Sequence, residues 1–488
     1  MTKLSAWKKA CALFVLCAAT AIAARAQTFT TLASFEGTNG AEPSLMSLVQ
    51  GADGNLYGTT QYGGVSRCYM GCGSVFSLTL SGNLQGFNLC RGNKCVGGSN
   101  PIAGLTLGTD GSFYGTTTFG GRAGCGGNGC GTVFKMTSGG QMVTLWRFDD
   151  RDGYAPYAPV VPGFDGNFYG TTEGGGTAGG SGTVFEMTRF GALTTLHSFN
   201  VEDGSEPAAA LLLASDGNLY GTTTSGGVPH DSGTLFKINV QGVLTTLHNF
   251  CAYSGCADGG SPNSALIEAS DGNLYGTTTV GGDSYCVPEG CGTIFKVTPA
   301  GQLITVHEFD ESDGSSPIGG IIQATDGNFY GTTAGGGSGL CGCGTVFQIT
   351  PSGTLTTLHN FDGADGLAPF GGLLQDTNGS FYGTTYQGGN TPCSSSTGCG
   401  TAFRLDMGLG PFVTFVRAAG KVGQTGGILG QGFTGTTSVS LNGTPESFTV
   451  VSDTYLRATV PVGATTGYVT VTTPSGTLTS NVPFHVIK

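Results

Sequence analysis

The apolar residues of this chain recur in short alternating runs of roughly five residues, separated by turns rich in glycine, asparagine and aspartate. Alternation with a period of two is typical of half-buried β-strands. One segment, D-G-N-L-Y-G-T-T, recurs seven times at spacings of 51 to 57 residues. Its tyrosines are Tyr57, Tyr114, Tyr169, Tyr220, Tyr275, Tyr330 and Tyr382. The chain is therefore predicted to be a tandem repeat of small antiparallel sheets.

Each repeat contains four of these runs. The first precedes D-G, the second is N-L-Y-G-T-T, the third resembles G-T-V-F, and the fourth resembles T-T-L-H-x-F, as in residues 194–199. A lone four-stranded sheet leaves both faces in water, and packing seven such sheets face to face buries them. The predicted fold class is all-β, a seven-bladed β-propeller over residues 27–407. The repeated tyrosine is expected to belong to its core.

The two ends of the repeat region complement each other. The region begins with an unaccompanied fourth strand at residues 28–35, and the last repeat stops after its third strand, near Leu405. The N-terminal strand is therefore predicted to complete the last blade and to close the ring. This agreement argues against an open solenoid.

Residues 411–488 have a different pattern. The repeat marks and cysteine are absent, and alternating strands such as those around Phe448 and Val469 predict a small β-sandwich. This part of the chain is similar to an IPT/TIG immunoglobulin-like domain. The similarity rests on Gly430-Gln431-Gly432-Phe433, on segment 448–461 and on segment 467–486. Such domains act as spacers or interaction modules.

The repeats themselves resemble a known family. Over about residues 28–407 they are similar to the GloVer tandem repeat of secreted bacterial proteins, and more distantly to virginiamycin B lyase-type propellers. The resemblance implies a propeller and an exported protein. It implies no particular activity.

Composition and charge narrow the class of protein further. Glycine accounts for 90 of 488 residues without a G-X-Y period, and only 10% of residues are charged while 10% are aromatic, which argues against collagen, helical folds and disorder. Residues 1–26 are expected to be a signal peptide, with an apolar stretch over 10–23 and cleavage near Ala26. Its removal takes away four basic residues and shifts the net charge from −12 to −16. Nucleic acid and anionic membrane partners are therefore not expected, and no later stretch reaches the about 20 apolar residues of a membrane span.

The 14 remaining cysteines form seven close pairs, as expected for disulfides in a secreted or cell-surface protein. The pairs are Cys68/Cys72, Cys90/Cys95, Cys125/Cys130, Cys251/Cys256, Cys286/Cys291, Cys341/Cys343 and Cys393/Cys399. Metal binding through thiolates is the alternative, and it is disfavoured because no pair has a second pair or a histidine at zinc spacing. Cys341 and Cys343 would have to close a small ring.

The loops divide unequally between the two faces of the predicted propeller. The connections between the first and second strands and between the third and fourth are tight turns. All the length variation and all the cysteine pairs fall in the other two connections, which share one face. Since variable loops on a rigid scaffold often carry function, we expect the loop-rich face to be the working face.

Two sets of polar residues on this face are candidate metal ligands. His197, His248, His307 and His359 recur in the fourth strand, but that strand is outermost and neighbouring blades diverge there, so a scaffold role is expected. Asp152, Asp203, Asp313 and Asp365 follow the fourth strand and could hold calcium. Turn formation by Asp-Gly is the alternative, and no loop has the spacing of a calcium loop. No cofactor is otherwise expected.

Three aromatic residues follow Y-G-T-T in blades that ring closure makes adjacent: Tyr62, Phe119 and Tyr386. Their rings could stack on sugars, and ordinary loop packing is the alternative.

No catalytic set emerges, although His230 and Glu173 are candidates for an enzyme. The chain is predicted to be a non-catalytic extracellular protein that binds a glycan or a protein. The alternatives are a propeller enzyme acting on a polysaccharide or a cyclic ester, and a purely structural surface spacer.

Overall fold

The computed structural model describes residues 27–487, except 44, 46, 65–70, 91–94, 96–97, 123, 253, 283–285, 287–289 and 390–397. Over this part of the chain the fold is all-β, with two short 3-10 helices, η1 (Cys125–Gly127) and η2 (Ser254–Cys256). No helix in the described residues is long and apolar enough to cross a bilayer. The expected signal peptide, residues 1–26, lies outside the described residues.

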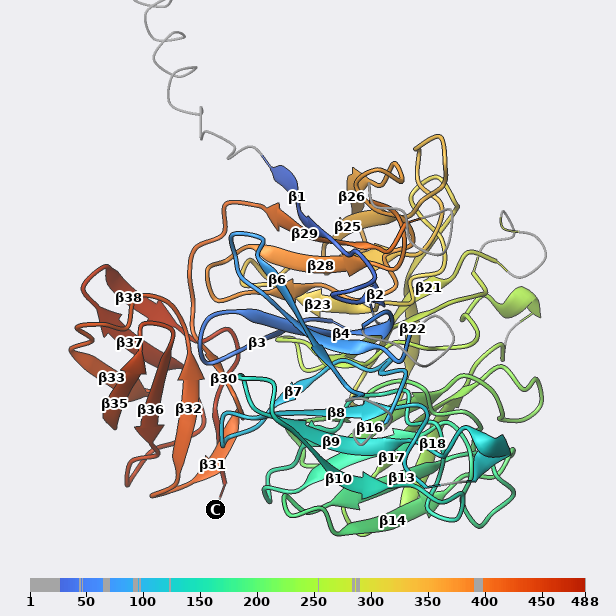
Figure 1. Cartoon of the computed structure of the whole chain (residues 1–488), viewed down its shortest axis with the longest axis horizontal. Coiled ribbons are helices and arrows are strands. Elements are labelled where there is room, and N and C mark those ends of the chain that lie inside the picture. The colour runs from blue at the N-terminus through green and yellow to red at the C-terminus, as the bar shows by residue number, and fades with distance from the viewer. Residues whose placement is uncertain are drawn as a thin grey trace, which may run out of the picture.

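The described residues of the repeat region form seven antiparallel sheets of the kind that make up propeller blades (Figure 1). We number them in chain order as sheet 1 (β2–β6), sheet 2 (β7–β10), sheet 3 (β11–β14), sheet 4 (β15–β18), sheet 5 (β19–β22), sheet 6 (β23–β26) and sheet 7 (β27–β29 with β1). The first strands are β2 (Ala41–Pro43) with β3 (Val49–Gln50), β7 (Thr106–Leu107), β11 (Val161–Pro162), β15 (Leu212–Leu213), β19 (Ile267–Glu268), β23 (Ile321–Gln323) and β27 (Leu374–Gln375). The second strands are β4 (Leu56–Tyr62), β8 (Phe113–Thr117), β12 (Phe168–Thr172), β16 (Leu219–Thr223), β20 (Leu274–Thr278), β24 (Phe329–Thr333) and β28 (Phe381–Thr385).

The outer two strands of each sheet complete the pattern. The third strands are β5 (Ser74–Leu78), β9 (Thr132–Met136), β13 (Thr183–Met187), β17 (Thr234–Ile238), β21 (Thr293–Val297), β25 (Thr345–Ile349) and β29 (Thr401–Asp406). The fourth strands are β6 (Leu84–Asn88), β10 (Met142–Arg147), β14 (Leu193–Ser198), β18 (Leu244–Asn249), β22 (Leu303–Glu308), β26 (Leu355–Asn360) and β1 (Thr28–Ser34). The first strands are two or three residues long, shorter than the roughly five residues expected from the sequence.

Sheet 7 takes its outermost strand from the other end of the chain. β1 pairs antiparallel with β29, from Thr28 opposite Asp406 to Ser34 opposite Thr401. Sheets 1 and 7 also touch, since β2 contacts β28 and the Gln50 side-chain amide donates a 2.8 Å hydrogen bond to the Thr377 hydroxyl. The pairing of the N-terminal strand is the one expected from the two ends of the repeat region.

The tyrosine of Y-G-T-T joins a turn to the neighbouring sheet. In sheets 1 to 6 its hydroxyl donates to the aspartate of the preceding D-G turn at 2.8 to 3.1 Å, as Tyr275 does to Asp271. Its ring packs on the Phe or Leu that precedes the next tyrosine, as Tyr275 does on Phe329, with ring centroids 4.4 Å apart. In sheet 7, Asn378 replaces the aspartate and donates to Tyr382. The expectation that these tyrosines belong to the core is confirmed for the six that are buried; Tyr220 is half-buried.

The glycine and the two threonines of Y-G-T-T have separate roles. A Cβ at the glycine would lie 2.5 to 2.6 Å from the ring of the third-strand phenylalanine, so only hydrogen fits there. In sheets 1, 2, 3, 5 and 6 the first threonine donates to a carbonyl of the next sheet, as Thr59 does to Ala103 at 2.6 Å. The second threonine shares a hydrogen bond with the hydroxyl opposite it on the third strand, as Thr60 does with Ser74 at 2.9 Å. The repeat therefore encodes contacts within a sheet and between sheets.

The C-terminal part of the chain forms two four-stranded sheets around one core. Its strands are β30 (Thr414–Phe415), β31 (Ala419–Lys421), β32 (Thr425–Leu429), β33 (Ser438–Leu441), β34 (Thr444–Pro445), β35 (Ser447–Ser452), β36 (Tyr455–Thr459), β37 (Val469–Thr473), β38 (Gly476–Thr479) and β39 (His485–Ile487). Ile428 and Leu456 of one sheet and Leu441 and Val471 of the other belong to that core, which also includes Phe433. β31 and β39 pair separately as two parallel strands.

This C-terminal part packs against the D-G turns of the repeat region, at the left of the sheets in Figure 1. Leu429 and Tyr455 share a core cluster with Phe113 of sheet 2. The Thr454 hydroxyl donates to the carbonyl of Ala52 at 3.0 Å. The side-chain amide of Gln431 donates to Thr377 at 2.9 Å. We call the end of the sheets that carries the D-G turns the turn face. Over sheets 1, 2 and 7 it forms an internal interface with the C-terminal part.

Substitution of a Y-G-T-T glycine tests this packing. In Gly276→Ala, the new Cβ would lie 2.6 Å from Cζ of Phe295 and 2.7 Å from Cδ2 of Leu266. We expect a loss of about 1–3 kcal/mol in the free energy of unfolding, because overpacking forces neighbours out of their rotamers. Gly410→Ala, where no atom lies within 4 Å of the new Cβ, is the control. Equal urea midpoints for the two variants would contradict the assignment.

Candidate functional site

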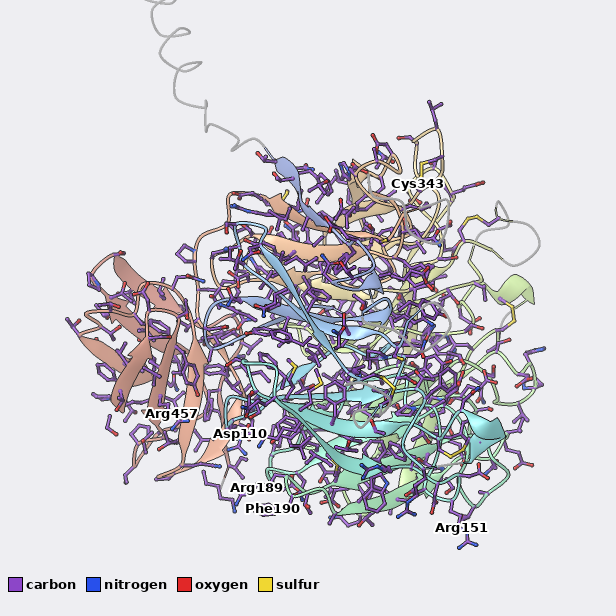
Figure 2. The ribbon with its side chains drawn as sticks, viewed as in Figure 1. Asp110, Arg151, Arg189, Phe190, Cys343 and Arg457 are labelled. Carbon is purple, nitrogen blue, oxygen red and sulfur yellow. A yellow bond between two sulfur atoms is a disulfide. The ribbon has the colours of Figure 1, made fainter. Side chains whose placement is uncertain are left out.

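The long loops and the tight turns lie at opposite ends of the sheets. Figure 2 shows Arg151 and Cys343, from long loops, on the side away from the C-terminal part. Arg189 and Phe190, from the turn between β13 and β14, lie with Asp110 on the same side as that part. The C-terminal part packs on the turns of sheets 1, 2 and 7, whereas none of its contacts among the described residues falls on the loop-rich face.

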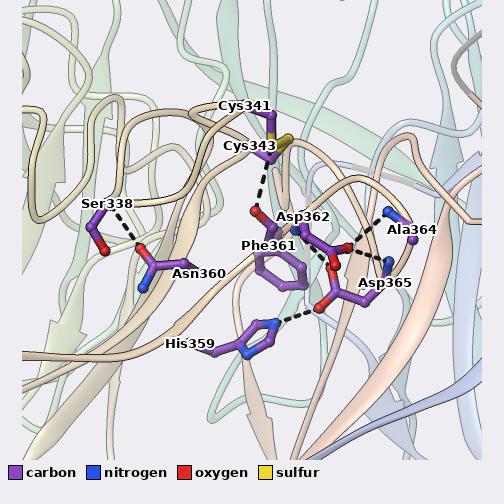
Figure 3. The surroundings of a disulfide bond; sticks show 9 residues. All are labelled: Ser338, Cys341, Cys343, His359, Asn360, Phe361, Asp362, Ala364 and Asp365. Carbon is purple, nitrogen blue, oxygen red and sulfur yellow. Dashed lines mark hydrogen bonds and ion pairs between the residues drawn. A yellow bond between two sulfur atoms is a disulfide. The ribbon is translucent and has the colours of Figure 1, made fainter.

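Disulfides brace the loops of the loop-rich face. All five expected pairs whose two cysteines are both described are formed: Cys90–Cys95, Cys125–Cys130, Cys251–Cys256, Cys286–Cys291 and Cys341–Cys343. Cys72 and Cys399 are disulfide-bonded too, and their expected partners, Cys68 and Cys393, lie outside the described residues. In Figure 3 the Sγ of Cys341 lies 3.4 Å from the carbonyl oxygen of Phe361, next to the fourth strand of sheet 6.

The candidate calcium ligands brace the same loops. In each, one carboxylate oxygen accepts the amide three residues earlier and the other accepts from a fourth-strand side chain, as Asp365 does from the amide of Asp362 and from His359 (Figure 3). The fourth-strand partners of Asp203, Asp313 and Asp365 are His197, His307 and His359, and that of Asp152 is Trp146. His248 pairs with Asp258, which lies ten residues later in the sequence rather than six, and the two side chains are 2.8 Å apart.

These pairs explain why histidine recurs in the fourth strand. Both oxygens of each aspartate accept hydrogen bonds, so calcium at Asp152, Asp203, Asp313 or Asp365 stays a prediction, and its binding would require breaking those hydrogen bonds.

Asp258 and Asp152 pair with different side chains, and the pKa values of these two aspartates shift in opposite directions. Burial would raise the pKa of Asp258, but the hydrogen bonds from His248 and from the amide of Ala252 hold that pKa below its usual value. Asp152, bonded to the neutral indole of Trp146, has its pKa raised by burial.

One backbone feature repeats at the inner end of these loops. The residue before the proline of each D-G-x-x-P has a φ between 49° and 59°, a region that non-glycine residues seldom adopt. These residues are Glu42, Asn100, Ala155, Glu206, Ser261, Ser316 and Ala368. In sheets 2 to 7 the carbonyl accepts the amide of the residue after Y-G-T-T, as Ala155 accepts from Glu173 at 3.0 Å. The repeat thus brings two variable positions side by side in each sheet.

Such positions from neighbouring sheets surround a pocket of about 230 Å³. We call it the mouth pocket; its lining residues are Leu45, Tyr157, Glu173, Ala208, Thr224, Ser261, Asn263, Thr279 and Ile318. Tyr157 and Glu173 come from sheet 3 and Asn263 from sheet 5. Within the described part of the chain, no hydrogen bond engages the side chains of these three. The pocket therefore presents a phenol, a carboxyl group and an amide with unused hydrogen-bonding capacity.

The carboxyl group of Glu173 is electrostatically unusual. Burial, and then the neighbouring charge of Glu206, raise the pKa of Glu173 to about 7. Burial raises the pKa of Tyr157 to about 12, with smaller contributions from Glu173, Tyr62 and Glu206. No lysine, arginine or histidine is among the described residues that line the pocket. At neutral pH, Glu173 is therefore close to half-protonated.

Two of the three aromatic candidates, Tyr62 and Tyr386, are joined through Gln61. The hydroxyl of Tyr386 donates to the side chain of Gln61 at 3.0 Å, and the amide of Gln61 donates to the hydroxyl of Tyr62 at 3.2 Å. The ring of Tyr386 packs on Phe370, with centroids 4.9 Å apart. Tyr62 is near enough to Tyr157 to influence its pKa. Neither Tyr62 nor Tyr386 is among the described residues that line the mouth pocket, so their binding role stays a prediction.

Of the remaining candidates, Phe119 and His230 are not among the described residues that line the mouth pocket. Phe119 is 36% exposed and its backbone pairs with that of Ser99. His230 is exposed and is not among the described residues that line the mouth pocket, whereas Glu173 is. Sequence reasoning missed Tyr157 and Asn263, which directly follow the proline of D-G-x-x-P. The sequence feature that could have identified them is that the residue after this proline varies from repeat to repeat, whereas the proline itself recurs.

A second depression lies further out on the loop-rich face. It measures about 440 Å³ and is lined by Arg151, Thr177, Ala178, Thr195, Leu196, His197 and Ser198. Its polar groups are largely used, since His197 bonds Asp203 and the hydroxyl of Ser198 accepts from Thr177. It offers fewer unused polar groups than the mouth pocket does.

Comparison with known proteins identifies the repeats and the fold. The family model described as Gloeobacter/Verrucomicrobia repeat matches residues 66–288 and 257–447. No curated protein matches the sequence. Among solved structures, a fungal alcohol oxidase of the AA5 family in complex with copper is 13% identical, with a TM-score of 0.52, and the match covers 94% of this chain and 99% of the oxidase.

Two further structures are more distant. PorZ, a surface component of the type-IX secretion system of Porphyromonas gingivalis, is 14% identical with a TM-score of 0.45, over 93% of this chain and 60% of PorZ. A putative gluconolactonase is 10% identical with a TM-score of 0.37, over 79% of this chain and 94% of the other. At such identities the likeness concerns the fold alone.

The raised pKa of Glu173 predicts a pH effect on stability. Between pH 4.5, the ordinary pKa, and about pH 7, the folded state holds more protons at Glu173 than the unfolded state does, so the free energy of unfolding falls as the pH rises. Glu173→Gln removes this contribution. From pH 5 to pH 8 we expect wild type to lose on the order of 1 kcal/mol more than the variant, by urea denaturation, after allowing for solvent screening. Parallel pH profiles would show that Glu173 titrates normally.

Proposed function

The chain belongs to the Gloeobacter/Verrucomicrobia repeat family, and from this membership we propose that it is a secreted or cell-surface protein that binds a glycan in the mouth pocket without catalysing a reaction. It is a propeller-like repeat protein with disulfides. Disulfides persist in oxidising compartments, which supports an extracellular location. A signal peptide over residues 1–26 would direct the export.

The proposed architecture is a seven-bladed propeller over residues 27–407, closed by the N-terminal strand, and an IPT/TIG immunoglobulin-like domain over 411–488. The pairing of β1 with β29 and the contact between β2 and β28 support closure. Two sheets around a shared core support an immunoglobulin-like sandwich. In this architecture the mouth pocket opens at one end of the central channel.

One observation carries the binding proposal: Tyr157, Glu173 and Asn263 line one pocket, and within the part of the chain that the structure describes no hydrogen bond engages their side chains. The three side chains are half-buried and reach solvent in the pocket, so a polar ligand could displace water there and take up their hydrogen bonds. Carboxyl and amide groups bind sugar hydroxyls, and an aromatic face packs on the apolar face of a sugar ring. A glycan supplies both kinds of surface.

The alternative of a propeller enzyme acting on a polysaccharide or a cyclic ester has one supporting observation. A carboxyl group with a pKa near neutrality, such as that of Glu173, can donate a proton in general acid catalysis. Such an enzyme would also need a second group aimed at the reacting atom, and His230 does not line the pocket. Binding therefore remains the preferred function.

A glycan array tests the proposal with refolded, oxidised residues 27–488. We expect a glycan to bind wild type and to lose about ten-fold or more in affinity with Tyr157→Ala, because an aromatic anchor at the centre of a site typically contributes that much. Phe190→Ala is the matched control, since Phe190 is 81% exposed on the opposite face. The triple variant Tyr62→Ala, Phe119→Ala, Tyr386→Ala tests whether the site extends to the aromatic candidates.

Two results would count against the proposal. Binding that survives Tyr157→Ala but disappears in the triple variant would move the site away from the mouth pocket. Absence of binding to every glycan on the array would leave a protein ligand or a structural spacer as the function.

A further inference from the structure

The mouth pocket has a charge imbalance that narrows the chemistry of its ligand. Glu173 lines the pocket, Glu206 is near enough to raise its pKa, and Glu42 lies within interaction distance of Tyr62 and Tyr386. No cationic side chain is among the described residues of the lining. A negatively charged ligand would be repelled here, whereas a cationic one would stabilise the ionised form of Glu173 and bring the raised pKa of its carboxyl group down.

We propose that the glycan held in the mouth pocket is an amino sugar with a free, protonated amine, and that its ammonium group binds between Glu173 and Tyr157. This inference rests on the proposed function and names the substrate class of the same site. The amide of Asn263 and the hydroxyl of Ser261, on the sheet 5 part of the lining, would receive the hydroxyl groups of the sugar.

The chemistry of the two anchoring groups favours an ammonium. A carboxylate in a partly desolvated pocket forms short, strong hydrogen bonds with a charged donor, and an ammonium offers three such donors. The face of a tyrosine ring attracts the same cation through its quadrupole, more strongly when water is excluded. Glu173 and Tyr157 come from the same sheet and line the same pocket, and the charge of Glu173 contributes to the raised pKa of Tyr157, so both groups can reach one bound ammonium.

The hydrogen bonds of the neighbouring carboxylates make Glu173 the group that is free to bind. The carboxylate of Glu206 accepts from the hydroxyls of Thr224 and Ser225, at 3.3 and 3.1 Å. Glu42 is buried, at 7% exposure, and lies beside the hydroxyl of Tyr386. Glu173 has no such partner among the described residues. A cationic ligand would supply it.

N-acetylation of the sugar provides the sharpest discrimination. The acetamide group carries no charge, so an N-acetylated oligosaccharide would gain no ion pair with Glu173, whereas the ammonium group of the free amine would. The two oligosaccharides otherwise present the same rings and nearly the same hydroxyl groups. A preference between them therefore reports on the charge of the amine.

The test compares the glucosamine tetramer with the N-acetylglucosamine tetramer by calorimetry at pH 6.5, on oxidised residues 27–488. We expect the free amine to bind wild type about ten-fold or more tightly than the acetylated form, and Glu173→Gln to abolish the preference, because hydrogen bonds to charged groups contribute about that much. Glu202→Gln, an exposed loop residue on the same face, makes the same change of charge and should retain the preference. Tyr157→Leu should lower affinity for the free amine several-fold.

The outcomes separate the inference from the proposed function. Equal affinity for the two tetramers would overturn the inference and leave glycan binding standing. A preference that persists in a correctly folded Glu173→Gln variant, or disappears equally in Glu202→Gln, would show that general electrostatic attraction rather than Glu173 selects the amine. Absence of binding to both tetramers and to the rest of the glycan array would overturn both.

Discussion

The contact between neighbouring sheets is the constraint on which the rest of this structure depends. In each repeat a tyrosine fixes the D-G turn of its own sheet through its hydroxyl and packs its ring on the next sheet, as Tyr275 does between Asp271 and Phe329. A glycine lets the third-strand phenylalanine approach, and a threonine joins the two sheets by a hydrogen bond. Since the same few atoms determine spacing within and between sheets, the four letters of Y-G-T-T can hardly vary.

That rigidity is what leaves other positions free. The residue before the proline of D-G-x-x-P and the residue after Y-G-T-T are held together by backbone hydrogen bonds, whatever their side chains are. Glutamate, serine, alanine and asparagine all occupy the first of these positions with the same left-handed φ. The scaffold can therefore display a different set of side chains at each sheet without a change in its backbone. The mouth pocket is one product of this arrangement.

The sequence predicted what repeats and missed what depends on distance in space. The tyrosine core was predictable because its segment recurs at regular spacing. The place of the N-terminal strand followed from the incomplete ends of the repeat region, and the disulfides followed from closely spaced cysteine pairs. Asn263 and Tyr157 share a pocket although 106 positions separate them along the chain, and each is a single deviation from its repeat. None of the histidine–aspartate pairs was predicted, although three of them share an offset of six residues along the chain, as His359 and Asp365 do.

The docking of the C-terminal part was equally beyond the sequence, since it depends on the shape of two surfaces. It has a mechanical consequence. The hydroxyl of Thr377 in sheet 7 accepts hydrogen bonds both from Gln50 of sheet 1 and from Gln431 of the C-terminal part. The C-terminal part therefore shares a hydrogen-bond acceptor with the contact between sheets 1 and 7, where the two ends of the repeat region meet. The two contacts are coupled through this one hydroxyl, so a shift of the C-terminal part on the turns would be transmitted by Thr377 to the contact between the first and last sheets.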